Sequence, residues 1–434
     1  MLLKVFKNTV LFSIIISISL VTFSCGQRTE QARKNVLKDT LALNDAPSTN
    51  RTLLSENKNL NVGANKTQDY LPLLQGKRVG IVANQTSVIF KTKRSKASFL
   101  NYTHLVDSLI AMNVDVKKVF APEHGFRGVA DAGEVVKDGL DTKTGLPIIS
   151  LYGKNKKPTA EQLKGLDLII FDIQDVGARF YTYISSLHYV MEACAEQNIP
   201  VLVLDRPNPN GHYIDGPILE KAHKSFVGMH PIPVVHGMTI GEYAQMINGE
   251  HWLTNGIQCQ LTVITVDHYN HQLPYKLPIN PSPNLPNAKA INLYPSLCFF
   301  EGTPISVGRG TNKQFQVIGS PKFKNEGFPF QFTPTTNAGA KYPKHDGEIC
   351  YGYDLSEYKT LDGLNLEWLI DFYNKSQTLN SETPFFTDFF TLLAGTQSLE
   401  KQIVAGWSEK EIRASWEAGL TAYSKTRAQY LLYP

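Results

Sequence analysis

A strand, a helix and a second strand follow one another in the middle of the chain. Residues 166–206 read LDLIIFDIQDVGARFYTYISSLHYVMEACAEQNIPVLVLDR. The runs 168–171 and 201–204 are short, apolar and rich in branched side chains, as in buried strands. The segment between them carries apolar residues at helical spacing, namely Ile184, Leu187, Met191 and Cys194. Two strands joined by an amphipathic helix predict a parallel βαβ unit.

The same alternation continues on both sides of this unit. Further strands are predicted at 78–83, 116–121, 148–151 and 260–266. A second helical face consists of Leu105, Val106, Leu109 and Ile110. Another helix is predicted to begin at Thr239, a suitable N-cap that has Glu242 three residues later. We therefore predict an α/β fold in which helices cover both faces of a parallel sheet.

The pattern changes after about Tyr269. Prolines cluster there, at Pro274, Pro278, Pro281, Pro283 and Pro286, and the regular alternation stops. Helices are predicted near 364–372 and 409–423, with an aromatic segment at 328–332. We predict two domains, an α/β domain at 67–269 and a smaller α+β domain at 270–434.

The N-terminal segment has the layout of an export signal. Lys4 and Lys7 precede the apolar run 10–23, and Ser24 stands directly before Cys25. The alternative is a transmembrane anchor, but the run is shorter than the ~20 apolar residues that cross a bilayer. The position of Cys25 resembles a bacterial lipoprotein processing site, although Thr22 and Phe23 fit that pattern loosely, so residues 1–25 are expected to be a signal peptide and Cys25 the lipidated residue.

The polar residues 26–66 have few aromatics, and we predict that they form a disordered tether. Because no acidic run follows Cys25, we expect an anchored protein that faces the periplasm rather than one displayed on the cell surface.

Composition and missing motifs exclude several classes of function. The net charge of +4 over 434 residues provides no strongly basic face for nucleic acid. The sequence contains no CxxC pair, no HExxH, no phosphate-binding GxxxxGK[ST] and no GxSxG. The turn at 83–87, ANQTS, lacks the glycines of a dinucleotide site. We expect no cofactor and no metal, which leaves carboxylates as the leading chemical groups.

Polar side chains follow four of the predicted strands. In chain order these are Asn84 and Gln85; Glu123 and His124; Asp172, Gln174 and Asp175; and Asp205 and Arg206. In an open parallel sheet the ligand crevice lies outside the carboxyl ends of the strands. These residues therefore predict a site along one edge of the sheet.

Glu123 is the best candidate for a catalytic acid. It lies in APEHGFRG, 121–128, between a strand end and a glycine-flanked loop. There Phe126 and a bound substrate would shield the carboxyl group from water, so that it could hold a proton at neutral pH. The alternative is a structural Glu that pairs with Arg127 or caps the next helix.

Asp172 and Asp175 could supply a second carboxylate that activates water or stabilises positive charge. Each also has a structural interpretation, because Asp172 could cap a helix and Asp175 could pair with Arg179. Tyr181 would suit a sugar contact, although such aromatics more often pack.

A glycine-rich segment in the second half, FEGTPISVGRGT at 300–311, offers Glu301 and Arg309. Arg309 could hold a substrate carboxylate through two parallel hydrogen bonds.

Several long motifs in one order resemble a known family. They are GKRVGIVANQTS, FAPEHGFRGVADAGE, TGLPIISLYG, DIQDVGARFYTYISSL, LDRPNPNG and YPSLCFFEGTPISVGRGT. The chain after the tether resembles the NamZ-type exo-β-N-acetylmuramidases of glycoside hydrolase family 171, formerly a domain of unknown function. The resemblance implies a Rossmann-like domain, an auxiliary domain and an active-site cleft between them.

The resemblance also implies a reaction, the removal of N-acetylmuramic acid from the non-reducing ends of peptidoglycan fragments, with Glu123 as the catalytic residue. The substrates would be muropeptides or disaccharides derived from peptidoglycan. Arg309 or Arg206 would hold the lactyl carboxylate. The predicted substrate-binding residues are Asn84, Gln85, His124, Arg127, Gln174, Arg179, Tyr181, Arg206, Glu301 and Arg309.

Two other functions are compatible with parts of this pattern. A non-catalytic muropeptide-binding lipoprotein would have a similar crevice. An esterase or amidase is disfavoured, because the sequence lacks an activated Ser or Cys and a metal constellation.

Overall fold

The structure is a computed structural model that describes residues 60–91, 101–127, 138–379 and 384–434. The predicted signal peptide with Cys25, and residues 26–59 of the predicted tether, lie outside the described residues.

A seven-stranded sheet forms the centre of the first half of the chain, with the order β5-β6-β4-β1-β7-β8-β9. Its strands are β1 (Val79–Ala83), β4 (Val116–Ala121), β5 (Gly139–Leu140), β6 (Pro147–Ser150), β7 (Leu168–Asp172), β8 (Val201–Leu204) and β9 (Leu261–Ile264). Every neighbouring pair is parallel except β5 with β6, at one edge. The parallel strands run outward from β1 in both directions in chain order. This is the doubly wound, Rossmann-like order, and the predicted fold class is confirmed.

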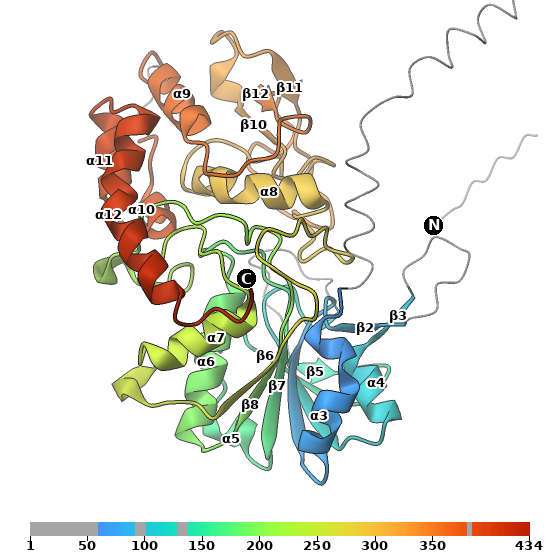
Figure 1. Cartoon of the computed structure of the whole chain (residues 1–434). Helices are drawn as coiled ribbons and strands as arrows, with labels where there is room; N and C mark the ends of the chain where they lie inside the picture. The colour runs from blue at the N-terminus through green and yellow to red at the C-terminus, as the bar shows by residue number, and fades with distance from the viewer. Residues whose placement is uncertain (1–59, 92–100, 128–137, 380–383) are drawn as a thin grey trace, which may run out of the picture. The chain divides into compact units, whose positions relative to one another are not determined.

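Helices cover both faces of this sheet (Figure 1). The helices are α3 (Thr67–Leu74), α4 (Leu105–Ala111), α5 (Ala160–Leu163), α6 (Tyr183–Glu196) and α7 (Ile240–Gly249). Alternate residues of β1 enter opposite cores: Ile81 packs with residues of α3 and α4, and Val82 with residues of α6 and α7. The central strands β1 and β7 are therefore buried throughout. The predicted capping box is present, because the Thr239 hydroxyl accepts from the Glu242 amide and the Glu242 carboxylate from the Thr239 amide.

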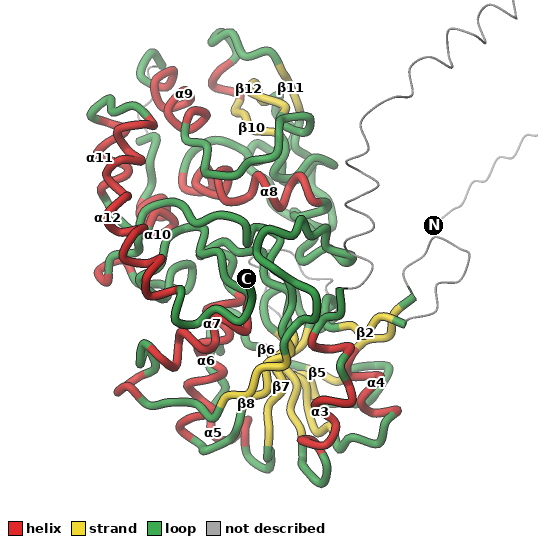
Figure 2. The backbone as a smooth tube through the Cα atoms, in the orientation of Figure 1, coloured by secondary structure: helices red, strands yellow, loops and turns green. Residues whose placement is uncertain are grey.

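The second half of the chain is a smaller mixture of helices and strands. It contains α8 (Ala288–Leu297), β10 (Val317–Ser320), β11 (Phe330–Phe332), β12 (Cys350–Asp354), α9 (Glu367–Ser376), α10 (Asp388–Ala394), α11 (Ser398–Val404) and α12 (Glu409–Arg427). The three strands form an antiparallel sheet in the order β10-β12-β11. Figure 2 shows long loops between the large sheet and α8. These loops carry much of the site described below.

Several short elements were absent from the prediction. The strands β2 (Val88–Phe90) and β3 (Tyr102–His104) pair as an antiparallel ribbon beside the large sheet. The 3₁₀ turns are η1 (Gly63–Asn65), η2 (Lys221–His223), η3 (Thr254–Gly256), η4 (Cys298–Gly302) and η5 (Pro321–Phe323).

The folded part begins before the predicted end of the tether, so the boundary at residue 66 is wrong. The amide of Gly63 donates to the carbonyl of Asp205 at 3.0 Å, and Asn61 pairs with Asp267 through their backbones. Val62 is buried. The segment is polar in sequence, and its order comes from backbone partners far along the chain.

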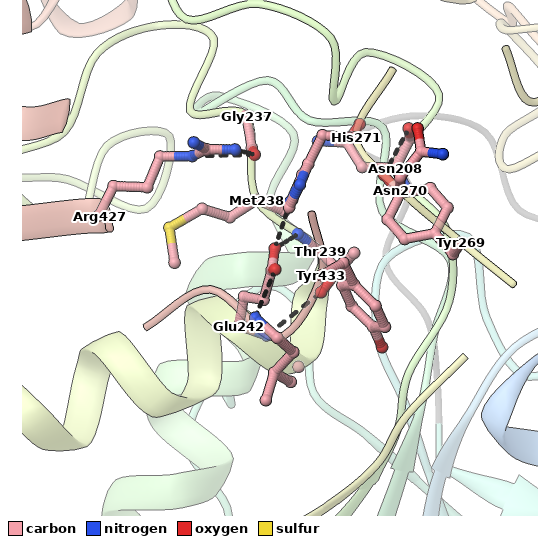
Figure 3. Close-up of polar contacts among 12 residues, drawn as sticks. Asn208, Gly237, Met238, Thr239, Glu242, Tyr269, Asn270, His271, Arg427 and Tyr433 are labelled. Carbon is pink, nitrogen blue, oxygen red and sulfur yellow. Dashed lines mark hydrogen bonds and ion pairs between the residues drawn. The ribbon is translucent and has the colours of Figure 1, made fainter. Parts of the chain in front are cut away.

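The C-terminal residues return to the first half of the chain (Figure 3). The carboxylate of Glu242, in α7, accepts from the amide of Leu432 at 2.9 Å. The hydroxyl of Tyr433 donates to Asp205 at 2.6 Å and accepts from the amide of Val266 at 2.9 Å. The last residues therefore close over the polar ends of β8 and β9. In the described part of the chain, no helix is long and apolar enough to span a bilayer.

Candidate active site

A pocket of about 420 Å³ lies between the carboxyl-end loops of the large sheet and the second half of the chain. This volume falls in the ~300–1,000 Å³ range of small-molecule sites. Its charged and hydrogen-bonding lining includes Glu123, His124, Thr182, Asn284, Glu301, Arg309 and Lys344. Its aromatic lining is Tyr152, Phe180, Tyr181, Phe226, Tyr294, Phe315, Tyr342 and Phe389. This lining suits a sugar, because aromatic rings can pack against the faces of the sugar ring and polar side chains can bind its hydroxyl groups.

Glu123 enters this pocket from the loop after β4, and α6 holds it there. Its Oε2 accepts a hydrogen bond of 2.8 Å from the hydroxyl of Thr182, the N-cap of α6. The hydroxyl of Tyr183 lies 3.3 Å from the backbone oxygen of Glu123. Asn84 donates to that hydroxyl at 3.0 Å. Asn84 is itself buried, so it supports Glu123 from behind and does not line the pocket.

The chain turns sharply directly after Glu123. His124 has a φ of 69° and Gly125 a φ of 77°. A residue other than glycine seldom adopts this left-handed conformation, and such residues cluster at functional sites. His124 is buried and lines the pocket beside Glu123. The PEHG motif therefore shapes the loop as well as supplying the carboxyl group of Glu123.

A second carboxyl group faces the same pocket from the opposite half of the chain. Glu301 forms a two-pronged ion pair with Arg309, with distances of 2.8 and 3.1 Å. Burial opposes the charge on Glu301, but Arg309 outweighs it and lowers the pKa of Glu301. Arg309 also lies over the ring of Phe315. The guanidinium and the carboxylate are thus fixed relative to each other before any ligand arrives.

Lys344 fastens the segment that carries Glu301. Its Nζ donates to the carbonyl oxygens of Phe300, Glu301 and Thr303, at 3.1, 3.0 and 2.6 Å. Burial lowers the pKa of Lys344 and the charge of Glu301 opposes that effect. The lysine lines the pocket and supports its floor at the same time.

Asp172 and Arg206 form an internal ion pair outside the pocket lining, with distances of 2.6 and 2.9 Å. Both side chains are buried. Burial raises the pKa of Asp172, and the charge of Arg206 acts against it. Arg206, which the sequence predicted as a partner for a substrate carboxylate, is buried and lies outside the pocket lining. Asp172 is likewise fully buried and lies outside the lining, so it does not face the pocket that Glu123 lines.

Asp175, Gln174 and Arg179 stabilise loops behind the pocket, outside its lining. Asp175 accepts from the amide of Gly177 at 2.7 Å, and Gln174 donates to the carbonyls of Asp175 and Pro207. The hydrogen bonds of the Arg179 guanidinium go to the carbonyl oxygens of Pro217, Ile232, Leu393 and Ala394. Burial lowers the pKa of Arg179 to about 9. The alternative pairing of Asp175 with Arg179 is therefore absent.

Gln85 and Arg127 border a different hollow, beside β2 and β3. Gln85 donates to the carbonyls of Asn280 and Pro281 at 3.1 and 3.0 Å. Arg127 binds the carboxylate of Asp141 at 2.9 and 2.7 Å. Both residues lie near the site without lining its pocket.

Tyr181 does line the pocket, and its hydroxyl donates to the carbonyl of Pro281 at 2.9 Å.

Sequence reasoning missed several pocket residues. Thr182 lies inside a quoted motif, and its position at the start of a predicted helix was a usable signal. Lys344 and Tyr342 come from a loop with no regular pattern, far along the chain from Glu123. Among the described residues, no three His, Cys, Asp or Glu side chains are placed to hold a metal ion.

A doubly wound α/β protein that brings two carboxyl groups, cations and aromatic rings to one pocket fits the class of glycoside hydrolases. The family model for the N-terminal part of exo-β-N-acetylmuramidase NamZ matches residues 79–289, and the model for its C-terminal part matches 292–433. The chain therefore belongs to the NamZ exo-β-N-acetylmuramidase family, and the resemblance seen in the sequence is confirmed.

Characterised and solved relatives cover most of the chain. It is 42% identical over 392 residues to the peptidoglycan β-N-acetylmuramidase NamZ of Bacillus subtilis strain 168, covering 84% of this chain and 89% of that protein. A solved DUF1343 family protein from Bacteroides fragilis is 46% identical, with a TM-score of 0.77 over 86% of this chain and 99% of its own. A second one from the same organism is 27% identical, with a TM-score of 0.70 over 87% and 99%.

Proposed function

We propose that this chain is an exo-acting glycosidase that releases N-acetylmuramic acid from the non-reducing ends of peptidoglycan fragments. The observation that carries the proposal is the position of Glu123, whose carboxyl group faces an aromatic pocket and is held by Thr182 at 2.8 Å. Membership of the NamZ family supports the same activity. A pure binding function would not require an acid held in this way.

Glu123 is the proton donor to the glycosidic oxygen. The hydroxyl of Thr182 suits this role because it can donate to the carboxylate and, after rotation, accept from the protonated acid. The acid thus keeps a partner on both sides of the proton transfer. Protonation of the leaving oxygen is the step that glycoside hydrolysis needs.

The charges in the pocket match a substrate with one negative charge. Its acidic side chains are Glu123 and Glu301, and its Lys and Arg side chains are Arg309 and Lys344. When Glu123 is protonated, these four groups sum to one positive charge. The lactyl carboxylate distinguishes N-acetylmuramic acid from N-acetylglucosamine and supplies the opposite charge. Arg309 is the group that would hold it, and Glu301 would stabilise positive charge at the anomeric carbon.

The test is the substitution Glu123→Gln, which keeps the shape of the side chain and removes the acid. Wild type should release free N-acetylmuramic acid from a muramyl-glucosamine disaccharide, and the Gln variant should lose more than about a hundredfold in kcat. Glu161→Gln, on the exposed helix α5, is the matched control. A Gln variant that folds and keeps wild-type turnover would overturn the role of Glu123. Disaccharide that binds to wild type but is never cleaved would favour the binding protein.

We also propose that the chain is exported and anchored by a lipid on Cys25, facing the periplasm. Support comes from the signal-like segment 1–25, which lies outside the described residues. The substrate is cell-wall material, which agrees with export. Cys25→Ala should move the protein from the membrane fraction to the soluble fraction. A variant that stayed in the membrane fraction would contradict lipid anchoring.

A further inference from the structure

Tyr342 lines the active-site pocket and yet is 95% exposed. Among the exposed large apolar side chains of the described residues, the next most exposed is Leu140, at 68%. A second pocket residue, Phe389, is 39% exposed. A ring exposed to this degree while it touches the pocket lies at its mouth rather than on its floor.

The loop around Tyr342 is tightly fastened, so its exposure does not reflect a loosely held segment. On one side, Lys344 binds three backbone carbonyls of the 300–303 segment, and the ring of His345 lies 2.7 Å from the carbonyl of Pro304. On the other side, Asn284 donates to the carbonyl of Gly339 at 2.7 Å. The backbones of Asn337 and Ala340 also pair.

The residue after Tyr342 is wedged against the motif that carries Arg309. Gly310 has a φ of 81°, and a Cβ built there would lie 2.8 Å from the side chain of Pro343. The amide of Thr335 donates to the carbonyl of Gly310 at 2.9 Å. These contacts therefore fix the backbone beside Tyr342 against the segment that carries Arg309.

An exposed aromatic ring, carried on a well-fastened loop at the mouth of a sugar pocket, is suited to stack against a sugar. The ordering of the loop is complete before binding, so stacking a ligand on the ring costs little further entropy. In an exo-acting enzyme the terminal residue lies at the catalytic acid, and the remainder of the glycan leaves through the mouth. The group next to Tyr342 is then the sugar on the leaving-group side of the cleaved bond.

We propose that Tyr342 is the stacking platform for that leaving-group sugar, the N-acetylhexosamine attached to the terminal muramyl residue. The proposal rests on the proposed function, because only exo cleavage puts the second sugar at the mouth. The apolar face of its pyranose ring covers the phenol ring, and the loop supplies the orientation. Tyr342 is thus a specificity-determining residue for the aglycone and takes no part in proton transfer.

The experiment compares two substrates that differ only in the aglycone. One is the muramyl-glucosamine disaccharide, and the other is methyl β-N-acetylmuraminide, which offers nothing to stack. For the disaccharide, Tyr342→Ala should raise KM about threefold to tenfold. For the methyl glycoside, KM and kcat should equal those of wild type. Tyr342→Phe and Tyr342→Trp should keep the low KM for the disaccharide.

The controls separate this inference from the activity itself. The melting temperature of Tyr342→Ala should equal that of wild type, because the ring is exposed. Trp407→Ala removes another exposed aromatic ring, at 41%, outside the pocket lining, and should change neither KM. If wild type cleaves both substrates but Tyr342→Ala leaves both KM values unchanged, or raises both equally, the stacking role is wrong. If wild type cleaves neither substrate, the proposed function fails instead.

Discussion

At the scale of single residues, the contact between Thr182 and Glu123 orients the carboxyl group that we propose as the catalytic acid. The hydroxyl lies 2.8 Å from Oε2 of Glu123. Replacing Thr182 by Val keeps the shape and removes the donor. We expect kcat for the disaccharide to fall about tenfold to a hundredfold, because a hydrogen bond to a charged group contributes ~1.5–3 kcal/mol. Steady-state kinetics should show little change in KM, since the contact orients the acid and not the sugar.

Thr182→Ser provides the control for this prediction, because serine restores the hydroxyl without the methyl group. Its kcat should return close to the wild-type value. Circular dichroism should show all three proteins equally folded. A Val variant with wild-type kcat, or a Ser variant as slow as the Val variant, would show that the hydroxyl does not orient Glu123.

Residue chemistry alone predicted that Glu123 faces the pocket, but it did not predict that Asp172 and Arg206 lie outside the pocket lining. Glu123, Asp172 and Arg206 all follow buried strands, so all three were equally expected at the edge of the sheet. Asp172 ends β7 and Arg206 follows the adjacent strand β8, and this adjacency lets the two side chains form an ion pair. Glu123 follows β4, on the other side of β1, and its carboxylate accepts from the hydroxyl of Thr182. The order of the strands in the sheet decides which of these side chains become neighbours, and short sequence motifs do not reveal that order.

At the scale of elements, the start of α4 depends on a neutral histidine. The Nδ1 of His104, the N-cap, accepts from the amide of Val106 at 3.3 Å, and its Nε2 donates to the carbonyl of Asn84 at 2.9 Å. A proton on Nδ1 would remove the acceptor. Burial lowers the pKa of His104 to about 4, whereas a histidine in the unfolded chain titrates near ~6.5.

This difference in pKa predicts a pH-dependent stability. Between about pH 6.5 and pH 4 the unfolded chain binds a proton at His104 that the folded chain does not, so stability falls as the pH falls through that window. The loss approaches about 3 kcal/mol at its lower end. His104→Asn keeps a side-chain acceptor for the cap and does not titrate. The free energy of unfolding of wild type should therefore fall more than that of the variant as the pH is lowered, so the difference between variant and wild type should increase.

Urea unfolding of both proteins at pH 7, 5.5 and 4.5 measures this difference in the free energy of unfolding. Other buried groups titrate equally in wild type and variant, so the difference between the two free energies isolates His104. A difference that stays constant from pH 7 to pH 4.5 would contradict the neutral cap.

Elements with a strong local pattern were predicted well, and those held by distant partners were not. The strands β1, β4, β7 and β8 are runs of buried apolar residues, and the sequence placed each within a residue or two. Residues 60–66 lack such a pattern. They are ordered because Lys66 pairs with Asp267 at 2.8 Å and Gly63 bonds to Asp205. A local reading of composition cannot find partners that lie so far along the chain.

At the scale of the whole described chain, the two family-model regions are fastened together at several buried points. Arg179, from the first region, binds the last carbonyls of α10 in the second. Tyr423 and Arg427, from α12, donate to the carbonyls of His236 and Gly237. These contacts cross the boundary between the two family models, which lies between residues 289 and 292.

These connections predict one cooperative unfolding transition. Far-UV circular dichroism follows the helices and strands of both regions, while tryptophan fluorescence after Trp252→Phe reports only the second, through Trp368, Trp407 and Trp416. The two midpoints in urea should coincide.

Tyr433→Phe removes a hydroxyl that donates to the buried Asp205, and should lower the free energy of unfolding by about 1–3 kcal/mol. Because Tyr433 is in the second region and Asp205 in the first, both signals should shift together. Two separate transitions, or a shift confined to one signal, would show that the regions unfold independently despite the shared contacts.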